Sequence, residues 1–162
     1  MKKEITINDR TIGFNTKPYI IAELSGNHNG DINRAIKLID AAVNSGADAI
    51  KLQTYTADTL TIDSNRPEFL IKGGPWDGKK LYDLYKEAST PWDWHPTIFK
   101  YAKQKKIHCF SSPFDNTAVD FLEKLSAPGA DNFSKKSTAG LSQGDEKQCI
   151  FFCLAYLEIV GC

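Results

Sequence analysis

The chain has 162 residues, enough for one domain with a workable buried core. Hydrophobic residues make up 41% of it and charged residues 25%, a balance that excludes a disordered or collagen-like chain. Its 20 basic and 20 acidic side chains cancel, so no overall positive field attracts nucleic acid or an anionic lipid surface.

Both ends of the chain bear on its compartment. Met1–Lys3 precede an alternating stretch, Glu4–Asp9, instead of the apolar run of a secretory signal, so we expect a cytoplasmic protein. The apolar stretch Cys149–Cys162 is too short to span a bilayer and contains Glu158, so no transmembrane segment is expected. The 4 cysteines spell out neither a disulfide framework nor a CxxC metal site.

The first part of the chain predicts a small hairpin followed by a strand and a helix. Glu4–Ile7 and Thr11–Phe14 flank a polar turn and are expected to pair as a packing element. The apolar, branched run Tyr19–Ala22 is typical of a buried parallel strand that ends near Glu23. The next helix is predicted to begin after Asp31, with apolar positions at helical spacing and Gly46 after its end.

The pattern then repeats twice. Ala47–Thr54 is predicted as a strand with Lys51 and Gln53 on one face and the apolar Ile50 and Leu52 on the other. A long insertion, 55–91, is predicted to hold a short helix at 81–88. Beyond it we expect a helix at 94–105, a strand at 106–112 and a helix reaching 125 that is capped by Asp115 or Asn116.

This order predicts an α/β fold with about three strand–helix units after the hairpin. Residues 1–125 form the predicted domain. At Ser126 the periodic pattern stops, and 126–162 are predicted to be a flexible, divergent tail. We therefore expect a reading frame that is truncated or shifted near Leu125.

Polar side chains at the ends of the predicted strands are the first candidates for function. Glu23, Lys51, Gln53 and Ser112 all lie at such ends, where ligands bind in parallel α/β folds. A lysine that faces inward at a strand end must meet an anion or a carboxylate, because an unpaired buried charge is costly. Lys51 therefore either binds an anionic ligand or forms a structural ion pair with Glu23.

Two short motifs leave two interpretations open. Asn27–Gly30 precede a helix start, which favours anions, but such residues also form ordinary turns. Ser111 and Ser112 either bind phosphate or cap the following helix. His28, His95 and His108 show no short-range ligand spacing, so a metal site made from them alone is not expected.

The insertion and its edge are rich in aromatic residues. These are Trp76, Tyr82, Tyr85, Trp92 and Trp94. Such a cluster either walls a sugar pocket, because sugars stack on aromatic rings, or packs a lid on itself. The sequence leaves both alternatives open.

Three separated blocks resemble the sialic acid synthase family. They are Ile21–Gly30, Gly46–Tyr55 and Cys109–Asp115. Two further stretches, Ile71–Ala88 and Thr90–His95, are similar to the pseudaminic acid synthase branch. The resemblance covers residues 1–125 and implies a TIM (β/α)8 barrel, of which this chain holds about the first three units after a small hairpin.

The resemblance implies a transferase that condenses phosphoenolpyruvate with an amino-sugar aldehyde and releases phosphate. In the pseudaminic branch the sugar is a diacetamido trideoxy altrose; N-acetylneuraminic or legionaminic acid synthesis is the alternative. Glu23 would be the catalytic residue, handling a proton or the attacking water. Lys51 and Ser112 would bind phosphoenolpyruvate, and Gln53, with Asn27 and His28, would contact the sugar.

The sequence also departs from the family pattern. The family uses a divalent metal, Mn²⁺ or Mg²⁺, held by two histidines of later strands, which we do not expect in this chain. A fourth strand with a phosphoenolpyruvate-binding lysine is replaced by Pro128–Lys136. Members form homodimers through a C-terminal antifreeze-like domain, which is also not expected here. The remaining alternative is therefore a catalytically inactive fragment.

Overall fold

The computed structural model of this chain describes residues 4–7, 10–13 and 15–125. The tail predicted at 126–162 lies outside the described residues. A small antiparallel hairpin pairs β1 (Ile5–Ile7) with β2 (Arg10–Ile12). The hairpin confirms the prediction, except that its second arm begins at Arg10.

The hairpin is fastened to the start of the main sheet by a charged side chain. Arg10 forms an ion pair with Asp48, and its guanidinium also donates to the Pro18 carbonyl oxygen at 3.0 Å. Asp48 in turn accepts a hydrogen bond from the Ile20 backbone N–H at 2.8 Å. The strand predicted to begin at Tyr19 therefore begins at Ile21, because the Asp48 side chain accepts the hydrogen bond that the Ile20 N–H would donate to a strand partner.

The main sheet has three parallel strands in chain order. These are β3 (Ile21–Glu23), β4 (Ala49–Thr54) and β5 (His108–Pro113). The helix α1 (Ile32–Asn44) connects the first two. The Asp31 carboxylate accepts from the Asn33 N–H at the start of α1, and Gly46 has a left-handed φ of 78° beyond its end, as predicted.

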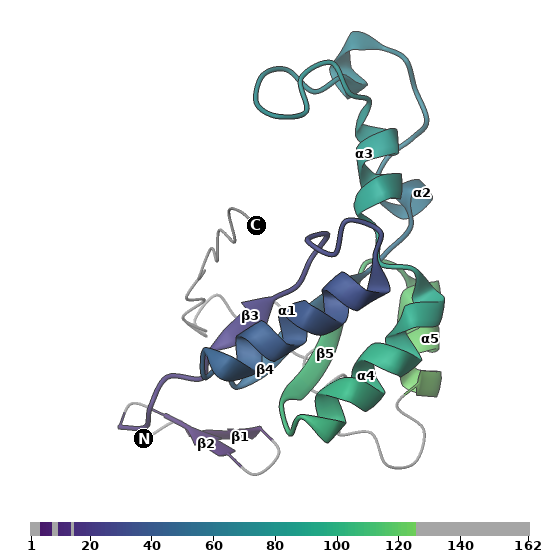
Figure 1. Ribbon diagram of the computed structural model, residues 1–162. Helices are drawn as coiled ribbons and strands as arrows, with labels where there is room; N and C mark the ends of the chain where they lie inside the picture. Colours follow the sequence, from purple (N-terminus) through teal and green to yellow (C-terminus); the bar gives the residue numbers. More distant parts are fainter. Residues whose placement is uncertain (1–3, 8–9, 14, 126–162) are drawn as a thin grey trace.

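The connection from β4 to β5 is long. It contains α2 (Ala57–Leu60), the 3₁₀ turn η1 (Pro67–Phe69), α3 (Leu81–Ala88), the 3₁₀ turn η2 (Trp92–Trp94) and α4 (His95–Gln104). Figure 1 shows α2 and α3 projecting beyond the sheet. The prediction located α3 correctly, whereas α2 and η1 were not predicted because elements of three or four residues have no usable periodicity.

The last helix is α5 (Asn116–Leu125). Asp115 is its cap: one carboxylate oxygen accepts from the Thr117 N–H at 2.7 Å and from the Ala118 N–H at 3.0 Å. The choice that the sequence left open between Asp115 and Asn116 is thus decided for Asp115. None of the helices in the described part of the chain is long and apolar enough to cross a membrane.

The core lies between one face of the sheet and helices α1 and α4 (Figure 1). Ile50 and Leu52 of β4 pack there with Ile39 of α1 and Ile98 of α4, and all four side chains are buried. Because side chains alternate along a strand, Lys51 and Gln53 must lie on the opposite face. The faces predicted for this strand are confirmed, and the polar residues face away from the helices.

We predict that truncating Ile98 destabilises the fold strongly. Ile98 is 0% exposed, so Ile98→Ala leaves a cavity and should lower the free energy of unfolding by about 2–5 kcal/mol. The matched control is Ile62→Ala in the insertion, where the side chain is 63% exposed and a change below about 0.5 kcal/mol is expected. Urea denaturation measures both; equal losses would contradict a core between α4 and the sheet.

Candidate active site at the strand ends

The parallel register brings four predicted residues onto one face of the sheet. Glu23 of β3 pairs with Lys51 of β4, and Gln53 of β4 pairs with Ser112 of β5. Neighbouring strands lie about 4.8 Å apart, so paired side chains on one face are within reach of the same small ligand. The structure therefore places a carboxylate, an ammonium, an amide and a hydroxyl together at the carboxyl ends of the strands.

Glu23 and Lys51 form an ion pair across β3 and β4. The Lys51 Nζ contacts the Glu23 Oε1, with side-chain exposures of 16% and 27% respectively. The ion pair that the sequence offered as an alternative to anion binding is thus present. Both groups retain exposed surface, so an anion can approach the ammonium from the open side of the sheet and share it with the carboxylate.

Gln53 and Ser112 are half-buried and stand side by side in register. An amide offers both a donor and an acceptor, and a hydroxyl offers one donor, so the pair can orient hydroxyl or phosphate oxygens. Neither group is ionisable near neutral pH. The pair can therefore bind and orient a polar ligand, but neither side chain acts as an acid or base at neutral pH.

The loop between β3 and α1 separates Asn27 from His28. Asn27 is exposed, and its carbonyl oxygen accepts a hydrogen bond from Arg34 Nε at 2.8 Å. His28 is 0% exposed; its Nδ1 accepts from the Gly30 N–H at 3.1 Å and its Nε2 lies 3.2 Å from Thr90 Oγ1. A direct contact between a sugar and the His28 ring would therefore require this loop to move, whereas Asn27 is accessible.

A second buried histidine lies behind the strand ends. His95, at the start of α4, is 0% exposed, and its Nε2 is 2.8 Å from Thr54 Oγ1. Thr54 Oγ1 is also 2.6 Å from Ser111 Oγ. The sequence analysis did not predict this cluster, because it depends on contacts between residues 41 and 57 positions apart.

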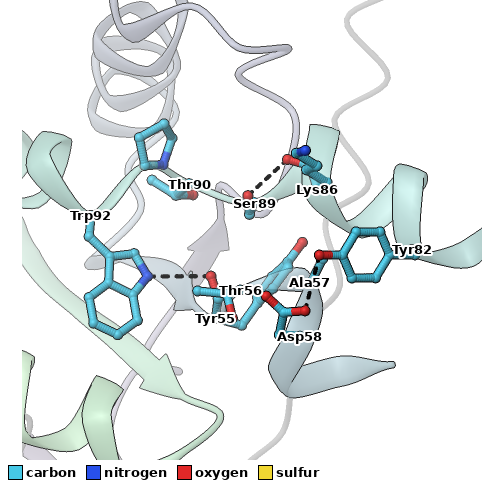
Figure 2. A pocket seen from close by; sticks show the side chains of 10 residues that line it. Tyr55, Thr56, Ala57, Asp58, Tyr82, Lys86, Ser89, Thr90 and Trp92 are labelled. Atoms are coloured by element: carbon cyan, nitrogen blue, oxygen red, sulfur yellow. Dashed lines mark hydrogen bonds between the residues drawn. The ribbon is translucent and has the colours of Figure 1, made fainter. Parts of the chain in front are cut away.

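The aromatic residues of the insertion do not form one cluster. Trp94 packs edge-on against His28, Tyr85 packs against Tyr55, and Trp76 is 52% exposed. Trp92 and Tyr82 line a pocket of about 300 Å³, shown in Figure 2. Some of these aromatic residues thus pack against neighbouring rings, and others line a pocket.

The pocket has a polar rim. The Tyr82 hydroxyl donates to Asp58 Oδ1 at 3.0 Å, and the Trp92 indole N–H donates to the Tyr55 carbonyl oxygen at 3.3 Å (Figure 2). Close to the pocket, the end of α3 packs tightly against the loop after β3. A Cβ at Gly26 would lie 3.0 Å from Ala88 Cβ, so glycine is what permits this approach.

A divalent metal does not fit the residues described. Within 4–7, 10–13 and 15–125, no group of three or more His, Cys, Asp or Glu side chains could hold a metal ion. Glu23 is paired with Lys51, and His28 and His95 use both ring nitrogens in hydrogen bonds within the protein. The described residues therefore do not form a metal site by themselves.

Comparison with known proteins identifies relatives over most of the described chain. A model of the NeuB family matches residues 38–131. The chain is 55% identical to the pseudaminic acid synthase of Campylobacter jejuni over 114 residues, which is 69% of this chain and 33% of that protein. It is 47% identical to the pseudaminic acid synthase of Helicobacter pylori over 111 residues, covering 68% of this chain and 33% of that protein.

A solved structure agrees with these matches. The N-acetylneuraminic acid synthetase of Leptospira borgpetersenii, crystallised with citrate, superposes with a TM-score of 0.62 at 30% identity, over 77% of this chain and 39% of that one. The fold is accordingly part of a TIM barrel, its first three strand–helix units preceded by a hairpin. The chain spans about a third of the length of the curated relatives it matches.

We predict that the fold loses stability as the pH falls below about 6.5. Burial lowers the pKa of both His28 and His95 from the ordinary 6.5. The unfolded chain therefore takes up protons first, and the free energy of unfolding falls from pH 6.5 toward the folded-state pKa values by up to about 1.4 kcal/mol per pH unit for each histidine. Urea denaturation across this pH range measures the slope.

The matched control for this prediction is a variant with both His28→Gln and His95→Gln. Hydrogen bonds lower the pKa of Asp40 and of Asp115 from 3.8. Protonation of these carboxylates therefore changes the free energy of unfolding only in more acidic solution. The double variant should be less stable at pH 7 and should lose most of the slope between pH 6.5 and 5. A slope that survives unchanged in the double variant would show that other groups cause it.

Proposed function

Because the chain belongs to the NeuB family, we propose that the whole protein is a pseudaminic acid synthase. It would condense phosphoenolpyruvate with a diacetamido trideoxy altrose and release phosphate. The observation that carries this proposal is the single sheet face shared by Glu23, Lys51, Gln53 and Ser112. The 55% identity to the C. jejuni enzyme supports the choice of sugar.

In this proposal Lys51 and Ser112 bind phosphoenolpyruvate. An ammonium and a hydroxyl provide charge-assisted and neutral hydrogen bonds to phosphate or carboxylate oxygens. The approaching anion takes a share of the Lys51 charge that is paired with Glu23 in the structure. Gln53, two residues beyond Lys51 and on the same face, orients the sugar through its amide, and the exposed Asn27 is proposed to add a further sugar contact.

Glu23 is the proposed proton-transfer group. In the condensation, C3 of phosphoenolpyruvate forms a bond with the aldehyde carbon, whose oxygen takes up a proton. Water then adds to C2, and the bond between C2 and the phosphate oxygen breaks to leave a ketone and inorganic phosphate. A carboxylate beside the bound anion can take the proton of that water, and general-base catalysis of this kind contributes about 10²–10⁴-fold.

The remaining parts of the proposal concern the rest of the protein. A divalent metal, Mn²⁺ or Mg²⁺, would be bound by residues outside those described here, since the described residues do not fit one. The whole protein would act as a homodimer in the cytoplasm, where phosphoenolpyruvate is made. The segment 126–162 is proposed to be a divergent tail.

We predict that two substitutions lower the activity of a chimera for different reasons. The chimera joins residues 1–125 of this chain to the last two thirds of the C. jejuni synthase. Glu23→Gln should lower kcat about 10²–10⁴-fold because it removes the base. Lys51→Met should instead raise KM for phosphoenolpyruvate at least about tenfold, because it removes a charged hydrogen bond to the anion.

Phosphate release in the presence of each aldehyde sugar measures these effects. Lys72→Met is the matched control, since Lys72 is exposed in the insertion and far along the chain from the strand ends. Faster phosphate release with the altrose derivative than with the sugar precursors of N-acetylneuraminic and legionaminic acid supports the proposed substrate. Preference for another sugar would overturn the substrate, and full activity of Glu23→Gln would overturn the mechanism.

A further inference from the structure

One short segment, Thr90–His95, contacts the loop after β3 and the carboxyl end of β4, and through Thr54 it is linked to β5. We name it the tether segment; it joins the insertion to α4. Thr90 Oγ1 reaches His28 in the loop after β3 at 3.2 Å, and the Trp92 indole donates to the Tyr55 carbonyl after β4. The His95 ring contacts Thr54 of β4 and, through it, Ser111 of β5.

The hydrogen bonds of His95 fix the direction of a buried chain of donors. Its Nδ1 lies 3.3 Å from the Pro91 carbonyl oxygen, which can only accept, so Nδ1 carries the proton. Burial lowers the pKa of His95, so the ring is neutral near pH 7 and its Nε2 is an acceptor. Thr54 therefore donates to His95, and the Ser111 hydroxyl donates to Thr54.

These hydrogen-bonded side chains lie directly behind the candidate site. Thr54 follows Gln53 in β4, and Ser111 precedes Ser112 in β5. Because successive side chains of a strand point to opposite faces, the Thr54 and Ser111 hydroxyls lie on the helix-facing side and Gln53 and Ser112 on the other. Thr54, His95 and Ser111 are 0%, 0% and 2% exposed, so water cannot replace a lost partner without entering the core. The bond between the hydroxyls thus fixes the two strand ends relative to each other.

We propose that His95, Thr54 and Ser111 are positioning residues that hold Gln53 and Ser112 at the spacing needed to bind both substrates. This inference rests on the proposed function and adds to it residues that touch no substrate. A site must be held within about 0.5 Å of its productive geometry by the shell that supports it. The tether segment provides that shell by tying β4 and β5 to the start of α4.

The first test uses the 162-residue chain and needs no activity. Thr54→Val keeps the shape of the side chain and removes both hydrogen bonds, whereas Thr54→Ser keeps the hydroxyl. Amide hydrogen exchange should become about tenfold faster in Thr54→Val at Ser112 and at Phe114, whose N–H donates to the Thr54 carbonyl oxygen. Thr54→Ser should restore the slow exchange.

Tyr101→Phe is the matched control. The Tyr101 hydroxyl donates to Asp40 at 2.9 Å and links α1 to α4 away from His95, at the other end of α4. The Tyr101→Phe substitution removes a partly buried hydrogen bond of a similar kind and leaves the strand ends unchanged. Faster exchange at Ser112 in Tyr101→Phe equal to that in Thr54→Val would show general loosening and overturn the proposal.

The second test asks for a catalytic consequence in the chimera defined above. Thr54→Val should lower kcat about 10–100-fold, as expected for a small misplacement of substrate-binding groups, with Thr54→Ser and Tyr101→Phe within twofold of the parent. Unchanged kcat in Thr54→Val would overturn the positioning role. An inactive parent chimera would instead contradict the proposed function, and the exchange experiment would then decide the role of the tether segment alone.

Discussion

The parallel register of β3, β4 and β5 determines where the four candidate residues on the sheet lie. Pairing of Glu23 with Lys51 and of Gln53 with Ser112 follows from that register alone. A shift of one residue in β4 would turn Lys51 and Gln53 toward the helices and bring Ile50 and Leu52 to the open face. The buried contacts of Ile50 and Leu52 with α1 and α4 therefore protect the site as well as the fold.

The charged pair on this face is compatible with both interpretations of Lys51, a structural ion pair and an anion-binding group. In the structure the ammonium meets the Glu23 carboxylate, which keeps a half-buried charge paired. The same arrangement leaves a cation and a base beside each other at the carboxyl end of the sheet, where ligands bind in this fold. A structural ion pair and an anion-binding site are thus two states of the same residues in our account.

Local patterns predicted much of this arrangement, and long-range contacts account for the rest. The cap and apolar spacing of α1 and the bounds of α3 were predicted from neighbouring residues. The alternation of β4 predicted which face carries Lys51 and Gln53. No local pattern predicts that His28 is buried, since its partner Thr90 lies 62 positions away, or that His95 joins Thr54 and Ser111. The NeuB family match, over residues 38–131, covers two of the three blocks that carry the resemblance, Gly46–Tyr55 and Cys109–Asp115.

The central claim is that the strand ends form one site for phosphoenolpyruvate and the sugar. A crystal structure of the chimera with phosphoenolpyruvate tests it most directly. Our account predicts a phosphate or carboxylate oxygen of the ligand within hydrogen-bond distance of both Lys51 Nζ and Ser112 Oγ, with Gln53 facing the space beside it. A ligand bound elsewhere, with the pair between Lys51 and Glu23 unchanged, would contradict the account.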